Sequence, residues 1–210
     1  MATTATTNTA TDPRIAVCGA GALGGTLVEH LLRMGWRQLR VVDDDRVAAH
    51  NTANQPYLLR QVGMAKVQAL AELVYEATEC EIESICQRIE ASNADRILRN
   101  CALVVDALDN AAGRVVVRDA CQRLGLPCLH VGLSSDGYAD LRCNDGYQIR
   151  DVTGVDTCQH GYTRNLVVLA VALASEAIGR WQQGASLCNR ELPLEALWQA
   201  TVVPWSTSGR

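Results

Sequence analysis

The segment VVDDDRVAAHNTANQ places three consecutive aspartates, residues 43–45, directly after a short apolar run. Carboxylates at the end of a strand can accept hydrogen bonds from ribose hydroxyls or bind Mg²⁺. Asn51 and Gln55 follow in the same segment, and Lys66 lies further along the chain. These residue types indicate a nucleotide site. They do not yet decide whether the acids belong to a dinucleotide-binding unit, as in a dehydrogenase, or serve another purpose.

A glycine-rich turn precedes this segment. GAGALGG, residues 19–25, contains the spacing Gly19-x-Gly21-x-x-Gly24 directly after the apolar run RIAVC and before a predicted helix. Glycines at these positions allow a tight turn and a close approach of the backbone, and a helix N-terminus attracts phosphate. Asp43 then follows the next predicted strand, where an acidic residue holds a ribose hydroxyl in such folds. This much fits NAD, FAD or ATP.

A second acidic position closes the apolar run ALVVDAL, residues 102–108, which Asp109 and Asn110 follow. Because the carboxyl ends of parallel strands line the ligand crevice, we predict that Asp43 and Asp109 face one pocket with Lys66 near it. A carboxylate at this edge suits Mg²⁺, and a lysine suits a phosphate. A dehydrogenase needs one acid for the ribose, so the residues after Asp43 do not support an NAD-dependent oxidoreductase.

In order and spacing, these motifs resemble those of the ThiF/MoeB/HesA family, the adenylating fold of ubiquitin-activating enzymes. The family pattern is G-x-G-x-x-G, D-x-D-x-V, N-x-x-R-Q, a separate Lys, and D-N-x-x-x-R. The sequence carries GAGALG, DDDRV, NTANQ, Lys66 and DNAAGR. The resemblance covers roughly residues 14–182. The combination is far more specific than the glycine motif alone.

The resemblance implies a role for each matching residue. The glycine loop would hold the phosphates of ATP, Asp43 would bind the ribose, and Lys66 would contact phosphates and stabilise charge in the transition state. Asp109 would bind Mg²⁺. The expected ATP-binding residues are Gly19, Gly21, Gly24, Asp43, Asp45, Asn51, Gln55, Lys66 and Asn110, and the expected catalytic residues are Lys66, Asp109 and Cys158. Asp45 could equally cap the turn that follows it.

The resemblance also implies a substrate and an assembly. Such proteins usually adenylate the C-terminal carboxylate of a small ubiquitin-like or sulfur-carrier protein that ends in Gly-Gly, giving an acyl-adenylate and pyrophosphate. They work as symmetric homodimers, and the long apolar helix expected near the end of the chain could supply part of that interface. Three alternatives stay open: adenylation of a small carboxylate or peptide, adenylation of a modified tRNA base, and a non-catalytic nucleotide-binding scaffold.

The sequence departs from the family pattern at several points. Asn54 stands where N-x-x-R-Q has arginine, and an amide cannot supply charge to a polyphosphate. We hypothesise that Arg60 reaches the phosphates instead. The N-terminal residues form a Thr/Ala-rich tail rather than the Arg-bearing helix of many relatives. The tetracysteine zinc site of several relatives is missing, so we expect no structural zinc.

Cys158, in DVTGVDTCQHG, is a candidate covalent acceptor because the resembling region of relatives often carries a cysteine there. A reactive cysteine needs nearby positive charge or a helix N-terminus, and His160 and Arg164 are close in sequence. A structural or unused cysteine is the competing interpretation. Two other residues have structural interpretations: Arg114 would pair with Asp109 or Asp106 in a helix–strand contact, and His130 would be a core histidine with a satisfied hydrogen bond.

These residues must be positioned by alternating strands and helices. We predict parallel strands at 14–18, 39–42, 81–85, 102–108 and 126–133, an antiparallel strand at 138–143, and helices at 26–36, 63–77, 91–100, 113–125 and 162–182. In the first helix, we expect Leu27, His30, Leu31 and Met34 to share one face. The expected fold is an α/β, Rossmann-like, mostly parallel sheet with antiparallel strands added after the fifth strand.

Bulk properties set further limits. The 210 residues carry a formal net charge of −4, which argues against a general nucleic-acid partner. No membrane span or signal peptide is expected, and nine cysteines without CxxC pairs suggest reduced thiols in a cytoplasm. We expect a disordered tail at 1–13, an adenylating domain at 14–183, and an extension of uncertain structure at 184–210.

Overall fold

The computed structural model describes residues 13–134, 137–143, 147, 149 and 163–193. Most of the expected N-terminal tail, Cys158 and the last part of the expected C-terminal extension lie outside these residues. No helix in the described part of the chain combines the length and apolar character needed to cross a bilayer.

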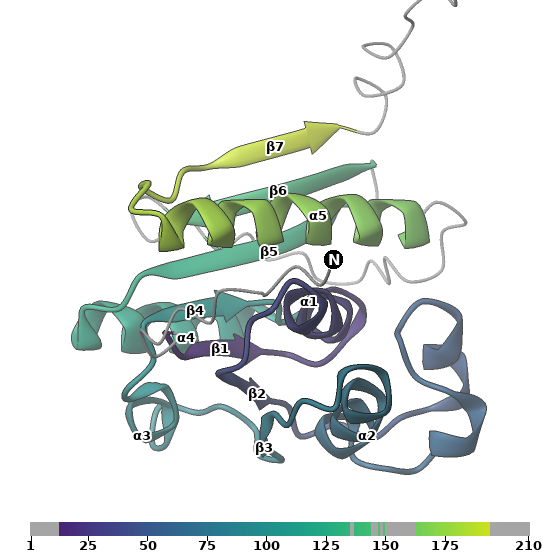
Figure 1. Ribbon diagram of the computed structural model, residues 1–210. Coiled ribbons are helices and arrows are strands. Elements are labelled where there is room, and N and C mark those ends of the chain that lie inside the picture. Colours follow the sequence, from purple (N-terminus) through teal and green to yellow (C-terminus); the bar gives the residue numbers. More distant parts are fainter. Residues whose placement is uncertain (1–12, 135–136, 144–146, 148, 150–162, 194–210) are drawn as a thin grey trace, which may run out of the picture.

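The described strands form one mixed sheet, in the order β3-β2-β1-β4-β5-β6-β7. Its first five strands are parallel, and β6 and β7 pair in antiparallel fashion at one edge, as Figure 1 shows. The strands are β1 (Ile15–Cys18), β2 (Leu39–Val42), β3 (Glu83–Ile85), β4 (Leu103–Asp106), β5 (Cys128–Ser134), β6 (Tyr138–Cys143) and β7 (Arg190–Pro193). The Rossmann-like α/β class with antiparallel strands after the fifth strand is therefore confirmed.

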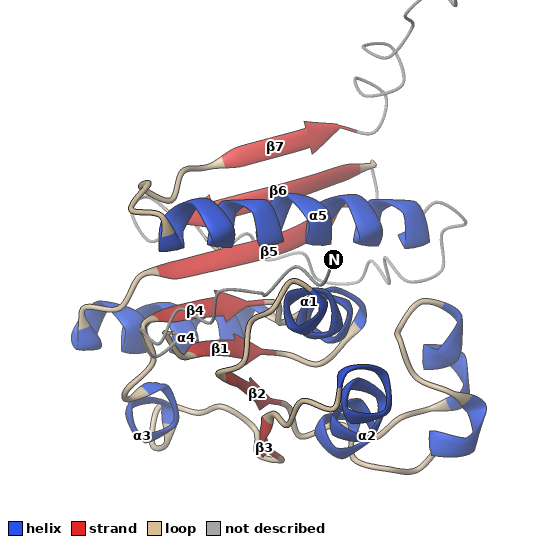
Figure 2. Cartoon of the chain, viewed as in Figure 1, coloured by secondary structure: helices blue, strands red, loops and turns tan. Residues whose placement is uncertain are grey.

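Helices cover both faces of the sheet (Figure 2). The helices are α1 (Ala22–Arg33), α2 (Lys66–Thr78), α3 (Ala94–Leu98), α4 (Ala111–Leu124) and α5 (Thr163–Gln182), with short 3₁₀ turns at Ala49–Ala53 and Leu59–Gln61. Alternate residues of the buried strands enter two separate apolar cores. One core packs α1, α2 and α5 against the sheet, and the other packs α3 and α4.

The first helix differs from the sequence prediction. It begins at Ala22 rather than at residue 26, and it ends at Arg33. Its buried face contains Leu27 and Leu31, as expected, but His30 and Met34 are exposed. The prediction for these two residues was wrong because Val28 and Leu32 complete the buried stripe instead, which turns His30 and Met34 to solvent.

The C-terminal part of the described chain adds to the sheet. Residues 190–193, within the expected extension, form β7, and β7 pairs with β6 along Tyr138–Leu141. The sheet thus continues beyond the long helix α5, whose buried side chains include Leu166, Val171 and Ile178.

The strand order places a topological switch point at β1. β1 pairs with β2 on one side and with β4 on the other, so the chain direction of the crossovers reverses at β1. In open parallel sheets, ligands bind outside the carboxyl ends of the strands at this switch point. The glycine loop follows β1, Asp43 follows β2, and residues 107–110 follow β4.

Candidate functional site

The glycine loop is shaped by close contacts that leave no room for side chains at two of its positions. Gly19 has a positive φ of 98°, and a Cβ there would lie 2.8 Å from the carbonyl oxygen of Ala107. A Cβ at Gly24 would lie 1.9 Å from the carbonyl oxygen of Gly19. By contrast, a Cβ at Gly21 would meet nothing within 4 Å. Gly21, the N-cap of α1, therefore faces open space in which a phosphate could approach the backbone.

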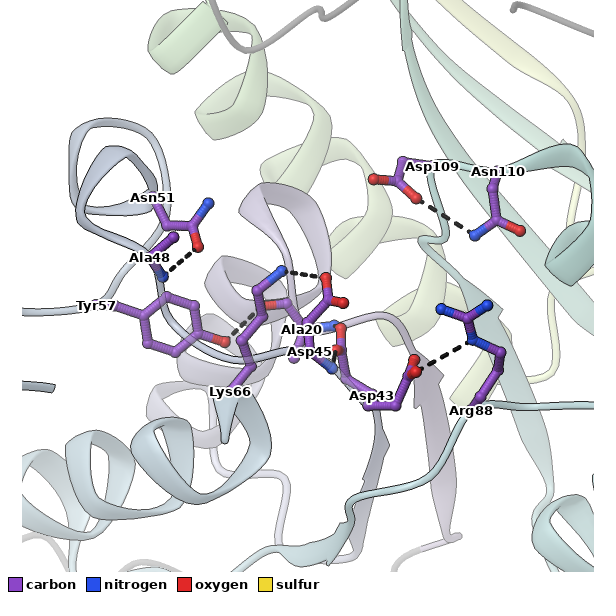
Figure 3. A network of polar contacts seen from close by, with 11 residues as sticks. Ala20, Asp43, Asp45, Ala48, Asn51, Tyr57, Lys66, Arg88, Asp109 and Asn110 are labelled. Atoms are coloured by element: carbon purple, nitrogen blue, oxygen red, sulfur yellow. Dashed lines mark hydrogen bonds and ion pairs between the residues drawn. The ribbon is translucent and has the colours of Figure 1, made fainter. Parts of the chain in front are cut away.

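Ala20 connects the glycine loop to the segment after β2. Its N–H donates to Asp43 Oδ2 at 2.6 Å, and its carbonyl oxygen accepts from the hydroxyl of Tyr57. Figure 3 shows the three side by side. Tyr57 is 2% exposed, so this hydrogen bond is shielded from water. The backbone on which phosphate would bind is thus fixed from both sides before any ligand arrives.

Asp43 holds two backbone groups at once. Oδ2 accepts from Ala20, and Oδ1 accepts from the N–H of Asp45 at 2.7 Å. Burial raises the pKa of this carboxyl above its usual range, while the two backbone hydrogen bonds and Lys66 act in the opposite direction. Each carboxylate oxygen can accept more than one hydrogen bond. Asp43 can therefore hold the loop and still accept a ribose hydroxyl.

Lys66 is the only lysine in the 210-residue sequence, and it opens α2. Its Nζ lies 2.8 Å from Asp45 Oδ2, with side-chain exposures of 9% for Lys66 and 60% for Asp45. Its backbone N–H also donates to the carbonyl of Asp45 at 2.9 Å. The buried ammonium is thus aimed at an exposed carboxylate, which an incoming phosphate could replace as its partner.

Asn51 and Gln55 lie on the segment between β2 and α2. Asn51 is buried, and its Oδ1 accepts from the N–H of Ala48 at 2.8 Å. Within the described residues, its Nδ2 has no hydrogen-bond partner and remains available as a donor. Gln55 Oε1 is buried and likewise has no partner in the described part of the chain. The structure brings Asn51 to the same side of the fold as Lys66 (Figure 3).

Asp109 and Asn110 lie apart from this group, on the loop after β4 (Figure 3). Asn110 is the N-cap of α4, and its Oδ1 accepts from the N–H of Gly113 at 2.8 Å. Its Nδ2 contacts Asp109 Oδ1 at 3.4 Å. Within the described residues, no hydrogen bond or ion pair joins Asp109 to Asp43 or Lys66. Asp109 is exposed, and most of the lone pairs of its carboxylate have no hydrogen-bond partner within the described residues. Such a carboxylate suits a Mg²⁺ ligand.

The three consecutive carboxylates fit Mg²⁺ less well than Asp109 does. Their oxygens lie within 4.8 Å of one another. However, both oxygens of Asp43 already hold backbone N–H groups, Asp45 pairs with Lys66, and Asp44 pairs with Arg88 at 3.1 Å. Among these four acids, only Asp109 holds neither a backbone N–H nor a cationic side chain within the described residues; its carboxylate accepts one hydrogen bond, from Asn110 Nδ2.

Two arginines are candidates to take the place of the family arginine, at whose position this chain has Asn54. Arg60, our candidate phosphate contact, is exposed and pairs with Glu76 of α2 at 3.0 Å. Arg164, in the first turn of α5, donates from Nη1 to the carbonyl of Asn54 at 3.2 Å. A guanidinium therefore lies beside position 54, although it comes from a distant part of the sequence.

Sequence reasoning missed Tyr57, Arg88 and the pair formed by Asp106 and His130. No sequence motif marks Tyr57 or Arg88. Tyr57 donates to the backbone carbonyl of Ala20, and Arg88 pairs with Asp44, which is 44 residues away in the sequence. His130 was correctly interpreted as a core histidine: it is 3% exposed, with Nδ1 3.2 Å from Asp106 Oδ2. Arg114 makes a structural contact, but within the described residues its hydrogen bond goes to the carbonyl of Leu108 at 2.8 Å and not to the carboxylate of Asp106 or Asp109.

Comparisons with known proteins identify relatives of this chain. A SAMP-activating enzyme E1 of Haloferax volcanii is 32% identical over 136 residues, covering 63% of this chain and 50% of that protein. A sulfur carrier protein adenylyltransferase of Thermus thermophilus is 37% identical over 121 residues, covering 54% and 42%. The chain spans about half the length of the curated relatives it matches.

Solved structures share the fold. The E. coli tRNA N6-threonylcarbamoyladenosine dehydratase TcdA in complex with ATP superposes with a TM-score of 0.65 at 18% identity, covering 84% of this chain and 89% of that one. PaaA superposes with a TM-score of 0.71 at 15% identity, covering 87% and 61%. The model of the ThiF family matches residues 3–175, most of the chain. The chain therefore belongs to the ThiF family.

Proposed function

We propose that this protein uses ATP to adenylate the C-terminal carboxylate of a small ubiquitin-like or sulfur-carrier protein. The observation that carries the proposal is the connected network from Ala20 through Asp43 and Asp45 to Lys66, built around an open position at Gly21. This network offers a helix N-terminus, a ribose acceptor and an ammonium group within one crevice. A hydride-transfer enzyme would have no use for the ammonium at this place.

In the proposed reaction, the phosphates of ATP lie at the N-terminus of α1 and against Lys66, and the ribose contacts Asp43. An oxygen of the carrier's carboxylate attacks the α-phosphorus, and pyrophosphate leaves with the electron pair of the broken P–O bond. A carboxylate is already a competent nucleophile, so no general base is needed. Asp109 would hold Mg²⁺, which neutralises phosphate charge when bound. The protein contributes position and charge.

The substrate class rests on the names of the relatives, which include a SAMP-activating enzyme and adenylyltransferases of sulfur carrier proteins. In this proposal, the carrier ends in Gly-Gly, as the resemblance to the ThiF/MoeB/HesA family implies. We also propose a homodimer, with the exposed side of α5 around Val168 in the interface.

Cys158 is proposed as an acceptor that takes the activated acyl group after adenylation. Changing Cys158 to Ala should therefore leave ATP–pyrophosphate exchange largely unchanged and block any covalent transfer. Changing Asp109 to Ala should abolish exchange while the fold stays intact. Exchange at the wild-type rate in the Asp109 variant would remove this residue from the proposed site.

ATP–pyrophosphate exchange tests the proposal. It should require a Gly-Gly-ended carrier and disappear when the last two glycines of that carrier are removed. Exchange supported by small carboxylic acids would instead show a biosynthetic enzyme. ATP binding without any exchange would show a scaffold, and tight NADH binding without ATP binding would contradict the assignment.

A further inference from the structure

The loop that carries Asp109 is held at the residue just before it. The N–H of Leu108 donates to Asp106 Oδ1 at 3.1 Å, and the carbonyl of Leu108 accepts from Arg114 Nε at 2.8 Å. The backbone of Leu108 is therefore held at its N–H by Asp106 of β4 and at its carbonyl by Arg114 of α4. Asp109 follows directly, and among the described residues its carboxylate contacts only the neighbouring Asn110 Nδ2, at 3.4 Å.

Asp106 is in turn supported from the next strand. It is 1% exposed, and its second oxygen lies 3.2 Å from His130 Nδ1 on β5. The imidazole of His130 stacks on Tyr147 with ring centroids 4.5 Å apart and an angle of 21°. A buried carboxylate is costly unless it is paired and hydrogen-bonded. Within the described part of the chain, Asp106 meets that requirement through its contacts with Leu108 and His130.

Two glycines, Gly113 and Gly132, pack closely against the residues of this chain of contacts. A Cβ at Gly113 would lie 2.9 Å from Leu108 Cδ1 and 3.0 Å from Asn110 Oδ1. A Cβ at Gly132 would lie 3.1 Å from His130 Nε2 and 2.3 Å from Asp140 Oδ1. Glycines thus allow Leu108 and His130 to sit where the hydrogen bonds require, and the loop cannot shift without breaking several contacts.

We infer that Asp106 and Arg114 are positioning residues that fix the Asp109 carboxylate for Mg²⁺ by holding the peptide of Leu108. The inference rests on the proposed function, in which Asp109 binds the Mg²⁺ of MgATP. Mg²⁺ demands near-ideal octahedral geometry, so a ligand on a loosened loop loses affinity for the metal. Neither residue contacts the nucleotide in this assignment.

The test measures ATP binding by calorimetry, once with Mg²⁺ and once with EDTA. The ratio of the two dissociation constants reports the coupling between metal and nucleotide. In Arg114→Ala, we expect this coupling to fall by about tenfold, as for loss of one charge-assisted hydrogen bond, while the dissociation constant in EDTA stays within about twofold. Arg118→Ala is the matched control, because Arg118 lies on the same helix and pairs with half-buried Asp119 at 2.7 Å.

Asp106 is tested with two variants. Asp106→Asn keeps an oxygen for the Leu108 N–H and should retain most of the coupling. Asp106→Ala removes it and should behave like Arg114→Ala. If Asp106→Ala fails to fold, the Asn variant and Arg114→Ala still decide the matter. An equal loss of affinity in EDTA and in Mg²⁺ would overturn the inference, because it would mean that these residues serve the nucleotide or the fold.

A double variant shows whether Arg114 acts through Asp109. In an Asp109→Ala background, Arg114→Ala should cause no further loss of coupling, since the group that it positions is gone. Additive losses would contradict the inference. The proposed function fails differently: the wild-type protein would then show no carrier-dependent exchange, whereas failure of this inference leaves wild-type exchange intact.

Discussion

Lys66 combines two properties at the scale of the single residue. It is the only lysine of the sequence, and its ammonium is largely buried while its partner Asp45 is exposed. Taking an ammonium out of water is costly unless a charged partner compensates it. The structure therefore keeps a desolvated positive charge next to the glycine loop, where a phosphate would gain most from it.

An acyl-phosphate derivative of ATP tests this placement. Attack of the Lys66 amine on its acyl carbon would leave the acyl group on Lys66 and release ATP. We expect one labelled lysine peptide in a mass-spectrometric map, with protection by excess unlabelled ATP. The N-terminal amine serves as the internal control, because its labelling should not respond to ATP. Labelling of Lys66 that ATP does not suppress would place the phosphates elsewhere.

Tyr57 should stabilise the glycine loop through its hydroxyl. Changing Tyr57 to Phe leaves the buried carbonyl of Ala20 without its donor, so the free energy of unfolding should fall by about 1–2 kcal/mol. ATP affinity should fall as well. Tyr75→Phe is the control, since Tyr75 is exposed and its change should stay within about 0.5 kcal/mol. Equal losses in the two variants, measured by urea denaturation, would show that the hydroxyl of Tyr57 contributes nothing specific.

Asp43 should make nucleotide binding sensitive to acid. Because its pKa is raised in the folded protein, the folded state keeps this proton at a pH where the unfolded chain has lost it, so this group's contribution to stability falls as pH rises through that window. Below the raised pKa, the neutral carboxyl is a poorer partner for the ribose and for the N–H groups of Ala20 and Asp45.

The pH prediction is measured as the ratio of ATP affinities of the wild-type protein and Asp43→Ala, which cancels the titration of ATP itself. The ratio should shrink on acidification, beginning above the pH range in which an ordinary aspartate titrates. A ratio that stays constant until about pH 4, the ordinary aspartate value, would contradict the role of Asp43.

At the level of secondary structure, the turn between β1 and α1 contains one glycine that the fold requires, Gly24, and one that we expect ATP binding to require, Gly21. Gly24→Ala would force a Cβ to within 1.9 Å of a backbone oxygen, and we expect it to destabilise the protein by more than about 3 kcal/mol. Gly21→Ala meets no atom within 4 Å, so the variant should fold normally and lose about tenfold or more in ATP affinity. Gly179→Ala in α5, which is equally unobstructed, controls for the added methyl group.

Thermal melts and ATP titrations of these three variants decide the matter. If Gly21→Ala binds ATP as tightly as the wild-type protein, the open space at Gly21 is not where phosphate approaches. If Gly24→Ala is as stable as the wild type, the loop must adopt a different path from the one described.

At the scale of the whole molecule, the sheet was predictable because buried parallel strands read as continuous apolar runs. ALVVDAL and LPCLHVGL became β4 and β5, and the alternating YADLRC became antiparallel β6. Helix ends were less predictable, as α1 shows, because the glycines at its start favour no single boundary. The sequence of the extension did not predict β7, a four-residue edge strand with two exposed and two half-buried residues.

The site was predictable where residues follow strand ends and unpredictable where they pair across the fold. The switch point at β1 follows from strand order, so Asp43 and Asp109 could be placed at one edge from sequence. The pairing of Lys66 with Asp45 lies beside an isolated antiparallel bridge between Arg46 and Ala65, which brings residues distant in sequence together. The contact of Arg164 with Asn54 joins residues 110 apart, and local patterns cannot reveal it.

In the proposed reaction, a carboxylate oxygen of the carrier attacks the α-phosphorus of ATP at this site. The most direct test uses a Gly-Gly-ended carrier whose terminal carboxylate is labelled with ¹⁸O, with hydroxylamine added to cleave the acyl-adenylate. Hydroxylamine attacks the acyl carbon, so the bridging oxygen should leave with AMP and carry one ¹⁸O into it. AMP without the label, or label in the released pyrophosphate, would contradict the account.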